Sequence, residues 1–411
     1  MSPEREHPAG APEAPSWIGA ASARRGIWFL LATRILRGLA AGLITIGFPY
    51  LVLTDLRSGA LVLGLIYAGG ALSTALLAYL FGRFGSRHAM RTTYLVSLAL
   101  LPIACVVLLL PPELPLAVLA SVLGGFSATG SLASGGVGGI EMPLQTAILS
   151  DLAPPSKRTQ WFSQFTFTVG ISAAFGVLAG GFGTLDQLFM VALALSASSF
   201  LVAMAVPVRS VAQGRRPSAR SKGVIRRFAT TGILNGFSTG LLTPFLIPFF
   251  VLYFHVARPE MSIFTTASSL LGTFSVLSAP YLELRWGWVA SIVGTRAAAA
   301  TLAVLMPFVP LVPALAAYIA LPALRIAALP AQQTALMGHL PYADRSEAAG
   351  TNQAARIGAA SGATALGGFA LEDVAVAVPF LGYGLALAAN AFLYVRFFGW
   401  HGERLPAPTG G

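Results

Sequence analysis

The chain has little charge, almost no lysine and a single cysteine. Charged residues make up 10% of its 411 residues, against about 25% in an ordinary soluble domain, whereas 55% of the residues are apolar. With Cys105 alone, neither a disulfide framework nor a cysteine metal site is expected. The apolar excess also excludes a disordered or collagen-like chain. A chain this long, with a mean hydropathy of +0.74, is expected to cross a membrane many times.

Signals of enzymatic chemistry are missing as well. The five histidines lie in tails, in loops or at predicted helix ends, and none is four residues from another. No Gly-x-x-x-x-Gly-Lys phosphate-binding loop occurs. We therefore predict that the protein is not an enzyme and holds no cofactor and no metal, so a gradient must supply any energy that it uses.

Charges and Pro/Gly clusters divide the sequence into twelve segments, each long enough for a membrane-spanning helix of about 20 residues. The sequence thus predicts an all-α membrane protein with spans at 27–53, 59–81, 92–111, 116–150, 160–182, 187–207, 228–254, 262–282, 289–309, 312–337, 349–371 and 375–398. Residues 1–26 are rich in Pro and Ala and lack the apolar core of a signal peptide. They are predicted to form a disordered cytoplasmic tail, and residues 399–411 a second one.

Basic residues gather on one side of the predicted membrane fold. The tails and loops on the side of both termini hold 19 Lys and Arg, whereas the opposite loops hold only Arg57 and Arg258. The positive-inside rule places the first side in the cytoplasm. This bias accounts for most of the net charge of +11, so no nucleic-acid partner is expected. The abundance of Arg and Ala indicates a GC-rich bacterial genome, and hence a bacterial inner membrane.

The longest loop, 208–227, holds seven basic residues and no acidic one. It divides the chain into an N-terminal six-helix bundle, 27–207, and a C-terminal six-helix bundle, 228–398. A solvated linker is the favoured interpretation of this loop, and contact with anionic lipid is the alternative.

The two bundles are related by an internal repeat. At an offset of 198, residues 35–45 match residues 233–243 at six of eleven positions, which pairs Arg37 with Asn235. Offsets of 187 or 188 pair Gln145 with Gln333, Arg158 with Arg345, and Gly180-Gly181 with Gly367-Gly368. Parallel repeats of six helices are expected of a transporter built around an axis along the membrane normal.

The first half carries ten more residues than the second between Arg91 and Pro143, and this interval contains the glycine-rich run 124–139. Small residues allow membrane helices to approach closely, so a closely packed or partly unwound helix is the favoured interpretation. The alternative is a local break that lines a cavity beside Glu141.

Several short motifs resemble those of the major facilitator superfamily, and the likeness covers about residues 27–398. The family carries a loop of Gly, Asp-Arg, Gly and Arg-Arg/Lys after helix two. This chain matches the loop at Gly82, Arg87 and Arg91, with Ser86 in place of the Asp and Ala89 in place of the second Gly. The corresponding loops elsewhere supply three more basic residues at motif positions, namely Arg158, Arg285 and Arg345.

The fifth predicted helix resembles the Gly-Pro-x-x-Gly-Gly motif that the family associates with export. Gly176, Gly180 and Gly181 match it, and Val177 replaces the Pro. The resemblance implies twelve helices, transport by alternating access, and a central cavity lined by helices one, four, seven and ten.

Six charged residues lie inside the predicted spans: Arg34, Arg37, Arg296, Arg325, Arg356 and Glu141. A charge at the bilayer centre costs at least about 2.5–3.5 kcal/mol on the insertion scale. Arg34, Arg296 and Arg356 lie within reach of the cytoplasmic surface and are predicted to extend their side chains toward it. The other three lie about 14–18 Å deep, and each needs a partner or a wet cavity.

The resemblance places Arg37, Glu141, Asn235 and Arg325 on the cavity helices, and we predict that these residues bind the substrate. One interpretation is that an arginine pairs permanently with Glu141 and only holds helices together. The other is that the excess positive charge binds an anionic or strongly polar group, because one glutamate cannot neutralise two deep arginines. Glu141 is the only deep acid and therefore the candidate for proton coupling.

Helix seven and the repeat-related glutamines add further polar residues. Pro244 and Pro248 are predicted to kink the outer half of helix seven. Ser238 and Thr239 either face the cavity or bond back to their own helix, and the second is favoured. Gln145 and Gln333 are predicted to form gate or inter-helix hydrogen bonds.

The sequence therefore predicts a monomeric secondary transporter that moves a small organic solute across the inner membrane, with export as the favoured direction and proton exchange as an additional hypothesis. An organic-anion importer or exchanger is the first alternative. A non-transporting membrane sensor or scaffold is the second, and it would show no solute flux and a filled cavity.

Overall fold

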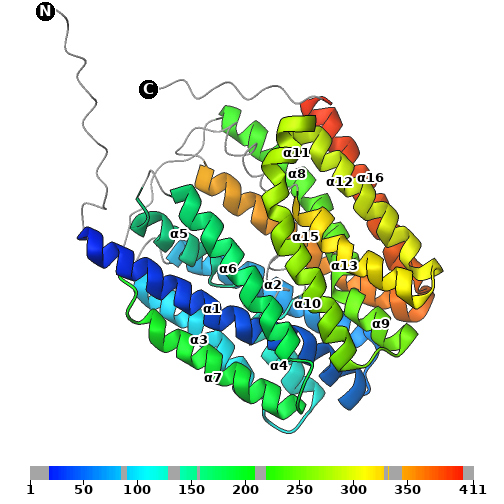
Figure 1. Cartoon of the computed structure of the whole chain (residues 1–411), viewed down its shortest axis with the longest axis horizontal. Coiled ribbons are helices and arrows are strands. Elements are labelled where there is room, and N and C mark those ends of the chain that lie inside the picture. Colours follow the sequence, from blue (N-terminus) through cyan, green and yellow to red (C-terminus); the bar gives the residue numbers. More distant parts are fainter. Residues whose placement is uncertain are drawn as a thin grey trace, which may run out of the picture.

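The computed structural model describes residues 18–84, 90–127, 139–154, 158–208, 219–327, 332 and 345–400. Within these ranges every regular element is a helix, and no strand occurs (Figure 1). Large apolar side chains, such as those of Leu72, Leu385 and Phe392, are exposed on the outside of the bundle. Lipid tails are as apolar as these side chains, so this surface suits a bilayer, and the predicted all-α membrane fold is confirmed.

The helices of the N-terminal half are α1 (Ala20–Tyr50), continued by the π-helical turn η1 (Leu51–Asp55), α2 (Ala60–Phe84), α3 (Met90–Leu108), α4 (Leu114–Gly124), α5 (Met142–Leu152), α6 (Arg158–Ala179) and α7 (Leu185–Ala203). The helices of the C-terminal half are α8 (Ala219–Leu242), η4 (Thr243–Phe245), α9 (Leu246–Phe254), α10 (Arg258–Ser275), η5 (Val276–Ser278), α11 (Ala279–Trp286), α12 (Trp288–Leu305), η6 (Met306–Phe308), α13 (Leu311–Ala327), α15 (Arg345–Phe369), η8 (Ala370–Val374) and α16 (Ala377–Phe398).

Each of the twelve predicted spans contains one helix or two consecutive helices, the tenth being described as far as Ala327. Judged by length and hydropathy alone, eight helical segments in the described part of the chain can cross a membrane. Three shorter apolar helices accompany them, at Leu114–Gly124, Gln164–Ala179 and Leu311–Ala327. The predicted kink of helix seven is present, because the 3-10 turn η4, which contains Pro244, separates α8 from α9.

The predicted span 116–150 is divided between two helices. α4 ends at Gly124, and Gly125 takes the left-handed conformation (φ +62°) that favours glycine. α5 begins at Met142 with Pro143 in its first turn, where the missing N–H of proline breaks no helical bond. Residues 128–138 of the glycine-rich run lie outside the described residues. The chain is non-helical over 125–127 and again over 139–141, directly before α5, and a cavity beside Glu141 stays a prediction.

Two segments predicted to be irregular are partly helical. Residues 20–26 of the predicted tail form the start of α1, and residues 219–227 of the predicted linker form the start of α8. Ala and Arg are strong helix formers, and a basic residue at a membrane surface does not end a helix. The rest of the linker, 209–218, is outside the described residues.

Glycines make matching close crossings in the two halves. In the N-terminal half, a Cβ added to Gly42 of α1 would collide with the carbonyl oxygen of Ala173 in α6. In the C-terminal half, a Cβ added to Gly240 of α8 would collide with the carbonyl oxygen of Ala360 in α15. The repeat offsets of 198 and 187 relate these two pairs, so the packing reproduces the repeat found in the sequence.

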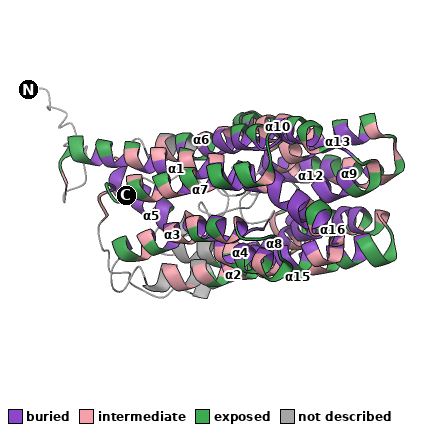
Figure 2. Ribbon diagram, turned by 90° about the horizontal axis from the view of Figure 1, so that it is seen from below, coloured by how far each residue is buried: buried purple, intermediate pink, exposed green. Residues whose placement is uncertain are grey.

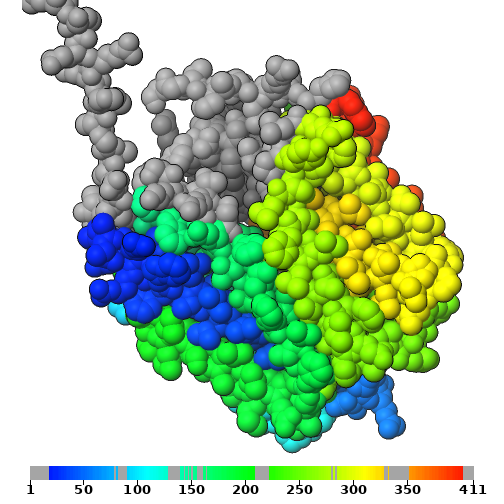
Figure 3. Space-filling model, in the orientation of Figure 1, coloured from blue at the N-terminus to red at the C-terminus, as the bar shows by residue number. Residues whose placement is uncertain are grey.

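The seam between the halves has two sides: α6 lies beside α10 on one face of the bundle (Figure 3), and α2 lies beside α15 on the opposite face (Figure 2). Figure 2 shows exposed residues along the outer edges of α10 and α15 and buried residues along their inner faces. At the end of the seam away from the termini, the Tyr50 hydroxyl donates to the Val256 carbonyl at 2.9 Å. There the Leu61 N–H also donates to the carboxylate of Glu372 at 2.7 Å. These bonds tie the halves together at that end.

Candidate functional site

A buried ion pair lies inside the N-terminal half. Arg37 of α1 donates from Nε to Oε1 of Glu141 and from Nη2 to Oε2, both at 2.9 Å. Its Nη1 donates to the carbonyl oxygen of Leu98 in α3 at 3.1 Å. Arg37 is 4% exposed and Glu141 1% exposed, so the pair is shielded from water and from lipid. The interpretation in which an arginine pairs with Glu141 fits this geometry.

Arg34 lies one turn before Arg37 and joins the same cluster. Its Nη1 lies 3.8 Å from Oε1 of Glu141 and donates to Oε1 of Gln145 at 2.9 Å. Its guanidinium also lies over the ring of Phe165, 4.8 Å from the centroid. Two arginines therefore share one carboxylate, and the cluster keeps a net positive charge.

The expectation that Arg34, Arg296 and Arg356 extend to the membrane surface is wrong. All three are buried, with exposed fractions of 6–8%. Each donates to a glutamine: Arg34 to Gln145, Arg296 to Gln332 at 3.1 Å, and Arg356 to Gln353 at 3.0 Å. A neutral amide oxygen satisfies a guanidinium donor without adding a second buried charge, so these arginines stay inside the bundle.

Arg325 of α13 differs from Arg37 in having hydroxyl partners. Its Nη1 donates to Oγ1 of Thr243 at 2.7 Å, and its Nη2 donates to Oγ1 of Thr239. Its guanidinium lies 6.0 Å from the ring centroid of Tyr383. Within the described ranges no carboxylate forms an ion pair with Arg325, which is half-buried. Among the described residues, two threonine hydroxyls and the Tyr383 ring are the partners of this positive charge.

Asn235, the repeat partner of Arg37, lies on the same helix as the threonines. Asn235 is buried, and its backbone carbonyl oxygen accepts from the hydroxyls of Ser238 at 2.9 Å and Thr239 at 2.7 Å. Both hydroxyls thus bond back to their own helix, as favoured from the sequence. Thr239 accepts from Arg325 at the same time, which links Asn235, Thr239 and Arg325 into one network.

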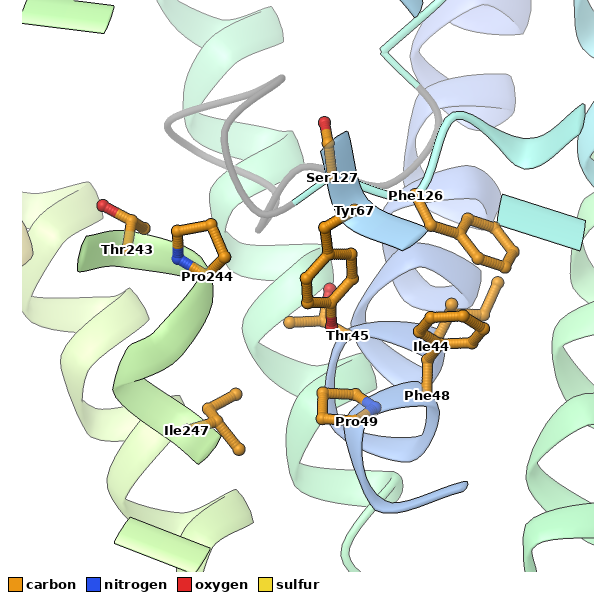
Figure 4. A pocket seen from close by; sticks show the side chains of 10 residues that line it. All are labelled: Ile44, Thr45, Phe48, Pro49, Tyr67, Phe126, Ser127, Thr243, Pro244 and Ile247. Atoms are coloured by element: carbon orange, nitrogen blue, oxygen red, sulfur yellow. The ribbon is translucent and has the colours of Figure 1, made fainter. Parts of the chain in front are cut away.

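A small cavity of about 30 Å³ lies between the two halves (Figure 4). Thr243, Pro244 and Ile247 of the C-terminal half form one wall, and aromatic residues of the N-terminal half, Phe48, Tyr67 and Phe126, form the other (Figure 4). Thr243 belongs both to this wall and to the partners of Arg325. The network around Arg325 therefore borders the space between the halves, whereas the Arg37–Glu141 pair lines none of it.

The structure describes part of the predicted loop motifs. Arg91 is exposed and donates to the Met204 carbonyl at 3.0 Å, and Arg285 is exposed and donates to the Tyr281 hydroxyl at 2.9 Å. Gly82 lies in the last turns of α2. Arg87 and Gln333 lie outside the described residues, as do the side chains of Arg158 and Arg345, which begin α6 and α15.

The three glycines of the fifth-helix motif make three kinds of contact. A Cβ on Gly176 would collide with the Leu39 carbonyl of α1, and one on Gly180 with the side chain of Ile46. A Cβ on Gly181 would collide with Ser262 of α10, across the seam. The motif thus serves close helix packing, both inside the N-terminal half and against the other half.

Two residues that contact arginines of the C-terminal half are not among the residues predicted from the sequence. Gln332 is the partner of Arg296, and the repeat alignment pointed to its neighbour Gln333. Tyr383 of α16 lies beside Arg325 of α13. In the sequence, only the position of Tyr383 on the buried face of its helix could have indicated a role for it. Among the described residues, no group of three or more His, Cys, Asp or Glu is placed to hold a metal ion.

Comparisons with known proteins agree on the fold. The family model described as Major Facilitator Superfamily matches residues 30–356. No curated protein matches the sequence. Similar solved structures include a variant of the nucleoside transporter NupG, which is 14% identical with a TM-score of 0.72 over 91% of this chain and 100% of that one.

Two further structures resemble the chain over most of its length. The human organic anion transporter MFSD10 (TETRAN) is 16% identical with a TM-score of 0.66, over 90% of this chain and 99% of that one. The xylose transporter XylE from E. coli, in an inward-open conformation, is 15% identical with a TM-score of 0.70, over 91% and 96%. At these identities the likeness concerns the fold alone.

Proposed function

The chain belongs to the Major Facilitator Superfamily, and we propose that it carries a small organic solute with an anionic or strongly polar group across the inner membrane. The transport follows alternating access between the two six-helix halves. Export is the proposed direction, because the glycines of the fifth helix resemble those of exporters. Import or exchange of an organic anion is the second candidate, and one of the similar structures is an organic anion transporter.

The observation that carries this proposal is the charge of Arg325. It borders the cavity between the halves through Thr243, and its described partners are hydroxyl groups. A carboxylate or phosphate on the solute would offer two oxygens to the planar guanidinium, and such charge-assisted bonds are about twice as strong as neutral ones. The solute then replaces the threonine hydroxyls as the acceptor for Arg325.

This assignment divides the predicted binding residues into two groups. Arg325 and Asn235 lie in the network that borders the cavity, and we assign them to the solute. Arg37 and Glu141 are already paired inside the N-terminal half, and we assign them to the coupling step. Protonation of Glu141 would remove the negative charge that holds Arg34 and Arg37, so a proton taken up there changes the packing of α1 against α5.

The test is flux into and out of proteoliposomes against a panel of anionic, neutral and cationic solutes, with and without a pH gradient. We expect anions to be preferred. For the best solute, Arg325→Gln should raise KM about 10- to 100-fold, which corresponds to about 1.5–3 kcal/mol for a charged hydrogen-bond pair. Arg325→Lys keeps the charge without the planar fork and should retain the preference for anions with weaker binding. A preference for cations, or an unchanged KM in Arg325→Gln, would contradict the assignment.

Coupling of solute flux to protons is tested separately, by measuring flux under an imposed proton gradient. Wild-type flux should respond to an imposed proton gradient, and the response should vanish in Glu141→Gln while flux down the solute gradient continues. A Glu141→Gln variant that keeps its pH response would show that protons are coupled elsewhere, and a wild type without such a response would show that they are not coupled. Absence of flux for every solute class would favour the sensor or scaffold alternative.

A further inference from the structure

Three arginines converge on an open pocket at the end of the C-terminal half where the chain ends. The pocket has a volume of about 390 Å³ and is lined by Arg226, Arg227 and Thr230 of α8 and by Arg396 and Phe397 of α16. None of its described lining residues is a carboxylate, and both ion pairs found in the described part of the chain use Glu141 instead. Like charges around one hollow repel each other, which favours an anion between them.

The pocket lies on a fixed seam between α8 and α16. The rings of Phe228 and Phe398 lie 4.9 Å apart. Nδ2 of Asn390 donates to the Thr231 carbonyl at 2.6 Å, and the Thr231 hydroxyl donates to that of Tyr394 at 3.3 Å. These contacts lie within about two turns of the arginines. They hold the two helices in place, so the backbone positions that carry the three arginines are fixed before any ligand arrives.

The level of the pocket suits the boundary between membrane and water. Arg396 and Phe397 are in the last turns of α16, shortly before Trp400, which is 53% exposed. Trp286 is 52% exposed at the end of α11, which lies at the same end of the bundle (Figure 1). Exposed tryptophans gather at the headgroup level of a bilayer, where basic residues meet the phosphates of anionic lipids.

We propose that the pocket formed by Arg226, Arg227 and Arg396 binds a phosphate group, and that this phosphate is the headgroup of an anionic membrane lipid. Guanidinium groups bind phosphate oxygens in pairs, and Phe397 gives the glycerol and acyl part of a lipid an apolar wall. The pocket shares no residue with the cavity between the halves, so the inference does not rest on the proposed solute.

The experiment uses the purified full chain in detergent micelles, titrated with phosphatidylglycerol, phosphatidylcholine or inorganic phosphate, and records the midpoint of thermal unfolding. Phosphatidylglycerol should raise the midpoint, and phosphatidylcholine should not. The variant Arg226→Gln/Arg396→Gln should need about 25-fold more phosphatidylglycerol for the same rise, because each arginine near an anionic headgroup contributes about fivefold.

A matched control removes two other exposed arginines at the same predicted membrane face. Arg24→Gln/Arg25→Gln, at the start of α1, should respond to phosphatidylglycerol like the wild type. If the double pocket variant does not fold, the single variant Arg396→Gln, near the end of α16, should show a fivefold loss. An equal response in pocket and control variants overturns the site. A rise with inorganic phosphate at the same concentration as with phosphatidylglycerol overturns the lipid as its ligand.

Discussion

The bidentate pair of Arg37 and Glu141 should be a main support of the N-terminal half, and its removal can be predicted in magnitude. Glu141→Gln keeps the size of the side chain and removes the only described carboxylate near two arginines that are 4% and 6% exposed. Removing one partner of a buried pair typically costs about 3–5 kcal/mol, because the other charge is left uncompensated away from water. The equilibrium constant for unfolding should rise more than about 100-fold.

The assay is the free energy of unfolding in detergent micelles, measured by denaturant titration for Arg37→Gln, Glu141→Gln and the double variant. The double variant should be less destabilised than the sum of the single variants, because it leaves fewer uncompensated charges. Arg91→Gln is the control: its arginine is exposed and donates to a backbone carbonyl, so the change should lie within about 0.5 kcal/mol. A loss below about 1 kcal/mol in Glu141→Gln, with additive single variants, would refute the reasoning.

Two more outcomes follow from the packing. Gly42→Ala and Gly240→Ala should each destabilise the protein by about 1–3 kcal/mol, because the new Cβ meets a backbone carbonyl that cannot move aside, whereas Gly294→Ala, with open space around it, should be neutral or slightly stabilising in the same unfolding assay. Glu372→Ala removes the carboxylate that accepts from the N–H of Leu61 at the start of α2. Opening of that end can be followed by labelling a cysteine at the cavity residue Thr45, introduced as Thr45→Cys, with an impermeant maleimide. Loss of a contact that contributes about 1 kcal/mol should raise the labelling about fivefold. Asp373→Ala is the control at the neighbouring residue, and the native Cys105 is buried and should be labelled little. Equal labelling in Glu372→Ala and Asp373→Ala would show that the Glu372 contact does not close that end.

The sequence was sufficient for the architecture because the bilayer imposes helix length and the repeat imposes symmetry. Charges and Pro/Gly clusters located the spans, and the repeat alignment of 35–45 with 233–243 pairs Gly42 with Gly240, which make crossings of the same kind in the structure. Hydropathy missed the break after Gly124, because the residues on both sides of it are as apolar as a continuous helix. Only the conformation of Gly125 shows where the helix ends.

The sequence predicts the candidate site only in part, because the depth of a residue along its helix does not reveal which side chains of the neighbouring helix contact it. Counting residues placed Arg34 and Arg296 near the surface, yet a glutamine on another helix holds each of them inside. The pairing of Glu141 with Arg37 rather than with Arg325 depends on how helices from one half face each other. Such facing is set by packing of the whole bundle and not by the spacing within one segment.

The glycine crossings also determine where the molecule is stiff and where it is compliant. Backbone lies directly against backbone at Gly42 and Gly240, so neither half can be compressed or sheared internally without a clash. Across the seam, a Cβ added to Gly181 would meet the Ser262 side chain, and one added to Gly368 of α15 would meet the backbone of α2 at Ala60 and Gly64. A rotation of one half against the other therefore has to slide or open these contacts of small residues, while the glycine crossings inside each half stay closed.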